Sequence, residues 1–233
     1  MPAAKTAVLV LLARSVRSGR VKTRLTPPLD AATAARVYEL LLEATVARSC
    51  DLGFAARVLA VYPDEHHAEM TANWPGFDLV LPQGDGDLGQ KLSRIFAHAH
   101  QRFGAGVVAI GADAPDLPPD RFASACEQIA AGRCAMCASA DGGYCLIATP
   151  EPAAALFDGI DWGTQRVAAQ TRDAAARCGV QLAELEPWQD VDTIEDVAGL
   201  LQRLKTTHDP HLVHLRRELN SLKLAGMTLE THD

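Results

Sequence analysis

Short apolar runs alternate with segments of helical spacing over the first 131 residues, and this alternation leaves few folds open to the chain. The apolar runs cover residues 7–13, 57–62, 77–81 and 107–110, and the helical segments cover residues 30–49, 64–71, 87–103 and 119–131. Such short, continuous runs are typical of strands buried on both faces of a sheet. Strands that alternate with helices favour an α/β fold of three layers, α/β/α, with a mostly parallel, Rossmann-like sheet.

The pattern changes after residue 131. Two strand-like runs, 134–139 and 144–148, are separated by a short segment that contains Asp141, Gly142 and Gly143. Parallel neighbours need a crossover of a dozen or more residues, so these two runs favour an antiparallel hairpin. We expect a further helix, strand and helix over residues 164–178, 180–185 and 194–205.

The composition shifts after Lys205, where His208, Asp209 and Pro210 follow. We therefore predict a main domain over residues 1–205 and a C-terminal helical appendage over residues 206–233. Leucines recur in the appendage every three or four residues, at positions 212, 215, 219 and 222. A short isolated helix is marginal in water, so this stripe is expected to dock on the domain or on a second copy in a homodimer.

Charge and hydropathy exclude some classes of partner. The chain has 22 basic and 29 acidic side chains, a formal net charge of −7, which argues against a nucleic-acid polymer as the main partner. No apolar run approaches the about 18 residues that cross a bilayer, so we expect no membrane partner. The first apolar run is short and followed at once by arginines, unlike a signal peptide. These features predict a cytoplasmic protein.

An acidic turn ends the run at residues 107–110. Residues 107–118 read VVAIGADAPDLP. In open α/β sheets, ligands bind outside the carboxyl ends of the strands, so we interpret Asp113 as a metal-binding carboxylate. The alternative is that Asp113 and Asp116 form an Asx-turn or cap the next helix.

Cations gather in the loop after the first strand. The loop contains Arg14, Arg17, Arg20, Lys22 and Arg24, the last two within the sequence VKTRL. A lysine is a compact charge and an arginine a bidentate fork, so Lys22 and Arg24 suit a phosphate group. A solvated basic loop would explain the same residues.

A glycine-rich turn opens the helix expected from residue 87. Residues 83–89 read QGDGDLG. Glycines at such a turn let a flat base approach the backbone, and Gln83 would read its edge. A plain turn is the alternative interpretation.

A second acidic motif precedes the helix expected from residue 194. Residues 190–196 read DVDTIED, and Asp192 would supply a carboxylate at the same sheet edge as Asp113. Two carboxylates with phosphate oxygens and waters suit Mg²⁺ or Mn²⁺. The spacing of Asp192 and Glu195 is also that of a capping box, in which Asp192 would only satisfy backbone N–H groups.

Residues 141–144 read DGGY, and Asp141 or Tyr144 could hydrogen-bond sugar-like hydroxyls. A tight hairpin turn explains the same residues. Nearby, Cys134 and Cys137 have the CxxC spacing of a zinc or redox pair. Because no second pair accompanies them and they lie inside a strand, reduced core thiols are the favoured interpretation.

In this order, VKTRL, QGDGDLG, IGADAPDLP, DGGY, DWGT and DVDTIED resemble the motifs of a bacterial family of GT-A-like glycosyltransferases of the arsenosugar-biosynthesis type. That family is similar to the molybdenum cofactor guanylyltransferases and the phospholactate guanylyltransferases. The resemblance covers residues from about 7 to 204. It implies a nucleotide-diphospho-sugar transferase fold that binds a nucleotide at the carboxyl edge of the sheet, with Mg²⁺ or Mn²⁺ bridging the phosphates.

The resemblance also implies a role for each motif. The implied catalytic residues are Asp113, Asp192 and Lys22, and the implied metal ligands are Asp113 and Asp192. The implied nucleotide-binding residues are Arg14, Lys22, Arg24, Gln83, Gly84, Gly86 and Asp113. The residues implied near the acceptor or sugar are Asp141, Gly142, Gly143, Tyr144, Trp162 and Thr164.

The implied activity is metal-dependent transfer from a nucleotide-activated donor to a small-molecule acceptor. The family label favours a glycosyltransferase that uses a nucleotide-sugar. The cationic VKTRL loop favours the alternative, a nucleotidyltransferase that joins a nucleoside triphosphate to a phosphorylated acceptor and releases pyrophosphate. A third hypothesis is a non-catalytic nucleotide-binding protein.

Overall fold

A seven-stranded sheet forms the centre of the protein, in a computed structural model that describes residues 7–18 and 21–222. The strands are β1 (Ala7–Arg14), β2 (Ala56–Tyr62), β3 (Leu79–Pro82), β4 (Gly106–Gly111), β5 (Cys134–Ser139), β6 (Tyr144–Thr149) and β7 (Leu182–Trp188). They are ordered β3-β2-β1-β4-β6-β5-β7. Only β6 runs antiparallel to its neighbours, β4 and β5, among the described strands. The sheet is therefore mostly parallel, and the hairpin expected between residues 139 and 144 is confirmed.

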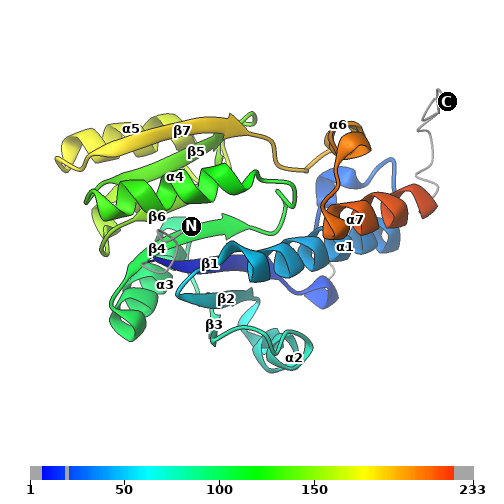
Figure 1. Ribbon diagram of the computed structural model, residues 1–233, viewed down its shortest axis with the longest axis horizontal. Coiled ribbons are helices and arrows are strands. Elements are labelled where there is room, and N and C mark those ends of the chain that lie inside the picture. The colour runs from blue at the N-terminus through cyan, green and yellow to red at the C-terminus, as the bar shows by residue number, and fades with distance from the viewer. Residues whose placement is uncertain (1–6, 19–20, 223–233) are drawn as a thin grey trace.

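Helices cover both faces of the sheet (Figure 1). They are α1 (Ala31–Ser49), α2 (His67–Asn73), α3 (Leu88–Phe103), α4 (Pro119–Ala130), α5 (Val167–Arg177), α6 (Ile194–Arg203) and α7 (Pro210–Ser221). Alternate residues of β1 point to opposite faces, so Leu9 packs in a core with α1 and α4, and Val10 packs in a core with α3 and α5. The three-layer α/β/α architecture is confirmed.

Two helix starts show why sequence patterns set boundaries only approximately. Asp30 caps α1 as predicted, because its Oδ1 accepts a hydrogen bond of 2.7 Å from the backbone N–H of Thr33. In contrast, α5 begins at Val167, three residues after the predicted start. The hydroxyl of Thr164 donates to the carbonyl of Asp161 and accepts from the N–H of Arg166, which holds this segment in a turn.

The leucine stripe of the C-terminal helix packs on the chain's own α1 and α6 (Figure 1). Leu212, Leu215 and Leu219 are buried in this third core. Docking on the domain, one of the two expected arrangements, is therefore what the structure shows for these three leucines, and a homodimer stays a prediction. Residues 223–233 of the predicted appendage lie outside the described residues, as does Arg20 of the cationic loop.

All six cysteines are free thiols, as expected. The thiol of Cys137 does not contact that of Cys134. It accepts a hydrogen bond from the thiol of Cys145 across the β5–β6 hairpin, where the two sulfur atoms lie 3.5 Å apart. Within the described ranges, no helix combines the length and the apolar character that crossing a membrane requires.

Candidate functional site

A cavity of about 640 Å³, here named the main cavity, opens at the carboxyl ends of β1 and β4. The sheet extends from β1 through β2 in one direction and from β4 through β6 in the other. Such a change of direction forms the crevice in which open α/β sheets bind ligands. The cavity is lined by Leu12, Ala13, Arg14, Val21, Lys22, Thr23, Arg24, Tyr38, Tyr62, Gln83, Gly86, Leu88, Lys91, Gly111, Ala112, Asp113 and Asp192.

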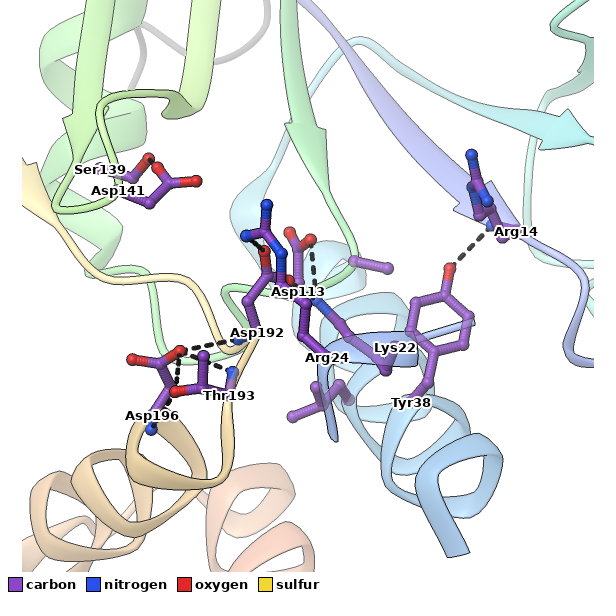
Figure 2. Close-up of polar contacts among 12 residues, drawn as sticks. Arg14, Lys22, Arg24, Tyr38, Asp113, Ser139, Asp141, Asp192, Thr193 and Asp196 are labelled. Carbon is purple, nitrogen blue, oxygen red and sulfur yellow. Dashed lines mark hydrogen bonds and ion pairs between the residues drawn. The ribbon is translucent and has the colours of Figure 1, made fainter. Parts of the chain in front are cut away.

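Lys22 joins the two carboxylates that the sequence singled out (Figure 2). Its Nζ lies 2.5 Å from Oδ1 of Asp192 and 3.2 Å from Oδ2 of Asp113, and its side chain is only 6% exposed. Burial alone would lower the pKa of Lys22, but Asp113 and Asp192 outweigh it and raise the pKa above its ordinary value. Lys22 is therefore a fixed cation at neutral pH.

The backbone of Lys22 is also unusual. With φ at 48°, Lys22 is the one non-glycine residue with positive φ among the described residues. This conformation costs free energy in a residue with a side chain, and such strain clusters at functional sites. The same turn positions Arg24, whose Nη1 lies 3.1 Å from Oδ2 of Asp192.

Two loops bring Asp113 and Asp192 together. Asp113 follows the end of β4, and its carbonyl accepts a hydrogen bond of 2.9 Å from the N–H of Val191. The capping box of α6 is formed by Thr193 and Asp196, not by Asp192 and Glu195 as the alternative interpretation had it. The carboxylate of Asp192 is therefore left to face Lys22 and Arg24 (Figure 2).

The turn after Asp113 has a structural role. Asp116 accepts hydrogen bonds from Arg203 on α6 and from Nε1 of Trp188 on β7, and no side chain caps α4. Asp116 therefore neither caps the next helix nor faces the main cavity, which leaves Asp113 as the carboxylate of this turn at the site.

Asp190 is a third carboxylate that our sequence reasoning did not assign. Ligand oxygens of Asp113, Asp190 and Asp192 all lie within 4.8 Å of one another. Burial, and then the charges of Asp113, Asp141 and Asp192, raise the pKa of Asp190 to about 7. The signal was present in DVDTIED, because residues two apart in an extended segment point the same way. Three crowded oxygen ligands are the donor set that divalent cations such as Mg²⁺ and Mn²⁺ prefer.

Arg14 and Gln83 lie at the other end of the main cavity. The backbone N–H of Arg14 donates to the hydroxyl of Tyr38 at 2.7 Å, which holds the end of β1 against α1 (Figure 2). Nε2 of Gln83 donates to the carbonyls of Ala13 and Ala60. Because its amide N–H groups donate to backbone carbonyls, Gln83 supports the wall of the main cavity, and its contact with a base stays a prediction.

The glycines of QGDGDLG adopt positive φ, as a tight turn requires: 73° at Gly84 and 103° at Gly86. Gly86 lines the main cavity. Arg94 of α3 donates to the carbonyls of Gln83 and Asp85, so this loop is held rigidly against the helix. The N–H of Gly84 is bonded to Asp64, which places Gly84 in the structure of the turn.

A second cavity of about 500 Å³, here named the side cavity, adjoins the main cavity at Arg24, Leu88 and Asp192. It is lined by Arg24, Leu88, Ser139, Asp141, Gly143, Tyr144, Trp162, Gly163, Thr164, Gln165, Val167, Asp190, Asp192 and Thr193. The β5–β6 hairpin supplies Asp141, whose Oδ1 accepts from the hydroxyl of Ser139 and from the N–H of Gly143. The structure thus brings DGGY, DWGT and DVDTIED to one place.

Gly142 has a structural role in place of the expected close approach to a ligand, whereas Tyr144 lines the side cavity. A Cβ on Gly142 would lie 2.1 Å from the carbonyl oxygen of Gln165, so Gly142 makes room for the chain's own backbone. The hydroxyl of Tyr144 is buried and has no hydrogen-bond partner among the described residues, and burial raises its pKa. The ring of Tyr144 meets Trp162 edge to face, with centroids 6.3 Å apart.

Solved structures share this architecture. A protein from Desulfovibrio desulfuricans G20, provisionally described as a nucleotide-diphospho-sugar transferase, is 26% identical with a TM-score of 0.81 and covers 94% of this chain and 96% of its own. A nucleotidyl transferase from Methanothermobacter is 16% identical with a TM-score of 0.55, over 91% of this chain and 99% of its own. A 4-diphosphocytidyl-2C-methyl-D-erythritol synthase from Anaerococcus prevotii is 8% identical with a TM-score of 0.55, over 93% and 97%.

These similarities confirm the nucleotide-diphospho-sugar transferase fold. They agree with a transferase that uses nucleotides, while the arsenosugar-biosynthesis subtype stays a prediction. Among curated proteins, none matches the chain. The model of the family described as uncharacterized protein conserved in bacteria, DUF2064, matches residues 45–164, just over half of the chain. The chain belongs to the DUF2064 family.

Proposed function

We propose that the protein is a metal-dependent transferase that uses a nucleotide-activated donor, and that the donor is a nucleotide-sugar. The observation that carries this proposal is the group of Asp113, Asp190 and Asp192 around Lys22, at the edge of the sheet where this fold binds ligands. The proposed acceptor is a small molecule held in the side cavity.

The three carboxylates would hold one divalent cation, Mg²⁺ or Mn²⁺. When bound, such a cation neutralises negative charge on the phosphates of the donor and on the leaving nucleotide. Lys22 and Arg24, on the neighbouring loop, would bind phosphate oxygens that the metal does not reach. The carboxylates fit a cation because their oxygens lie within 4.8 Å of one another, and a divalent cation would neutralise this crowded negative charge.

Catalysis would then depend on positioning and electrostatics. Lys22 is held by two carboxylates and a strained backbone, so its charge is organised before the substrate arrives. The side cavity would align the acceptor with the donor at the boundary formed by Arg24 and Asp192.

Transfer of a sugar is supported by the chemistry of the side cavity. The carboxylates of Asp141, Asp190 and Asp192 line this cavity and could accept hydrogen bonds from the hydroxyl groups of a sugar. Trp162 offers an aromatic surface. Arg24 is its only basic residue among those described, and Arg24 already pairs with Asp192. A phosphorylated acceptor, which nucleotidyl transfer would need, finds little positive charge there.

Nucleotidyl transfer remains the second candidate, because Lys22 and Arg24 could also hold the outer phosphates of a triphosphate. A thermal-shift screen of nucleoside triphosphates, diphosphates and nucleotide-sugars, each with and without Mg²⁺ or Mn²⁺, separates the two. A ligand at 100 times its Kd adds about 2.7 kcal/mol of stability. Metal-dependent stabilisation by nucleotide-sugars above triphosphates supports glycosyl transfer, and the reverse order supports nucleotidyl transfer. No stabilisation by any nucleotide would contradict both.

A further inference from the structure

A buried lysine without an acidic partner lies at the end of the main cavity away from the carboxylates. Lys91, in the first turn of α3, lines the cavity and is only 8% exposed. No carboxylate oxygen lies within 4.0 Å of its Nζ, and no acceptor bonds to it, among the described residues. Its ammonium group lies over the ring of Tyr62, whose centroid is 3.5 Å from Nζ.

The surroundings of Lys91 disfavour a cation. Burial lowers the pKa of Lys91, the charges of Arg14 and Arg94 act in the same direction, and the charges of Asp64 and Asp85 oppose them. A positive charge in the first turn also opposes the helix dipole. The cation–π contact with Tyr62 offsets part of this cost. The remainder indicates that a ligand supplies the missing acceptor.

Neighbouring donors in this part of the cavity are already in use. Gln83 donates to Ala13 and Ala60, and Arg94 donates to the carbonyls of Gln83 and Asp85. Among the described side chains of the β3–α3 loop and α3 that line the main cavity, Lys91 therefore carries the donors that no protein acceptor uses.

On the proposed function, the phosphates of the donor lie by Asp113, Asp192 and Lys22, so its base extends toward Gly86 and Lys91. We propose that Lys91 reads the nucleobase and selects one that presents a keto oxygen. An ammonium group donates hydrogen bonds and accepts none, so it pairs with a carbonyl oxygen and repels an exocyclic amino group. Hypoxanthine and guanine carry such an oxygen at C6 and uracil carries one at C4, whereas adenine and cytosine carry an amino group at these positions.

Isothermal titration calorimetry in the presence of Mn²⁺ tests this proposal with two matched pairs. Inosine diphosphate and adenosine diphosphate differ by keto and amino at one position, as do uridine and cytidine diphosphates. The wild-type protein should bind the keto member of one pair at least about tenfold more tightly, as a charge-assisted hydrogen bond provides. Lys91→Met should reduce this ratio below about threefold and leave the affinity for pyrophosphate unchanged.

Lys91→Met should fold, because methionine keeps the length of the side chain and removes a buried charge. Lys205→Met, on an exposed lysine far from the cavity, is the matched control and should keep the wild-type ratio. An unchanged ratio in Lys91→Met would overturn the role of Lys91 in reading the base. So would a loss of affinity for pyrophosphate as large as the loss for the keto nucleotide. Neither result would bear on the proposed function. Failure of the wild-type protein to bind any of the four nucleotides would overturn the proposed function as well.

Discussion

The main and side cavities share Arg24 and Asp192, yet their other walls offer opposite chemistry. Besides these shared residues, the main cavity has three basic side chains, Arg14, Lys22 and Lys91, and one carboxylate, Asp113. The side cavity adds two carboxylates, Asp141 and Asp190, and no further basic side chain in the part of the chain that the structure describes. The first therefore suits phosphates, and the second suits hydroxyl groups, with Asp192 where donor and acceptor would meet.

The largest effect is expected when the proposed metal site loses one of its three carboxylates. Asp113→Asn keeps the size of the side chain and removes its charge, so transfer should fall by about 100- to 1,000-fold. Rates with the donor found in the nucleotide screen measure this. Asp173→Asn, an exposed residue of α5, is the matched control. Full activity of Asp113→Asn would show that this carboxylate is not at the reacting centre.

Replacement of Lys22 tests whether the main cavity binds the phosphates of the nucleotide. Lys22→Ala should weaken nucleotide binding by about 1 to 3 kcal/mol, because a charge-assisted hydrogen bond is lost. Arg24→Ala should weaken it less, since the Arg24 side chain is 61% exposed and shared between the cavities. Calorimetry of a nucleoside diphosphate measures both, against Lys205→Ala. An affinity unchanged in Lys22→Ala would show that Lys22 does not bind the phosphates of the nucleotide.

Asp141 tests the side cavity separately. Asp141→Asn retains an oxygen that can accept from Ser139 and Gly143, so the hairpin should keep its shape. We expect the KM for the acceptor to rise by about tenfold, as one weakened hydrogen bond predicts. Affinity for the nucleotide, measured by calorimetry, should stay the same. A tenfold loss of nucleotide affinity in Asp141→Asn would contradict the assignment of donor and acceptor to separate cavities.

The smallest expected effect concerns the frame that both cavities share. Arg48 of α1 pairs with Asp209, the N-cap of α7, at 2.8 Å and also donates to the carbonyls of Pro115 and Leu117 behind Asp113. Partial burial would raise the pKa of Asp209, but its hydrogen bonds from Arg48 and from the N–H of Leu212 lower it below the ordinary 3.8.

A lowered pKa stabilises the fold above the unfolded value, and this stability is lost as the pH falls through the folded value. Asp209→Asn should therefore lower the free energy of unfolding by about 1 kcal/mol or less at pH 7. Melting curves over pH should show this difference shrinking as the pH drops below 3.8. A difference that grows in acid would contradict the pairing with Arg48.

Residue patterns were sufficient for the layers and for the acidic edge. The apolar run that became β4 and the abrupt turn to Asp113 are both local features, so periodicity and turn chemistry found them. The same reasoning found Lys22, Arg24 and Asp192, because charges after predicted strands must gather at one edge of a parallel sheet.

Other residues depend on contacts that a local pattern does not contain. Lys91 occupies an ordinary polar position in the sequence of α3, and its contact with the ring of Tyr62 on β2 joins residues 29 positions apart. The two backbone acceptors of Gln83 are 70 and 23 residues away in sequence, so no local pattern shows that its amide N–H groups are already bonded. Asp192 does not cap α6, because its neighbour Thr193 is the N-cap and forms the capping box with Asp196.

The most direct test of a metal-dependent nucleotide site is calorimetry of a nucleoside diphosphate with the wild-type protein, in Mn²⁺ and again in excess chelator. We expect one nucleotide per chain in Mn²⁺ and a loss of affinity of at least about tenfold in chelator. Equal affinity in both conditions would contradict a metal held by Asp113, Asp190 and Asp192.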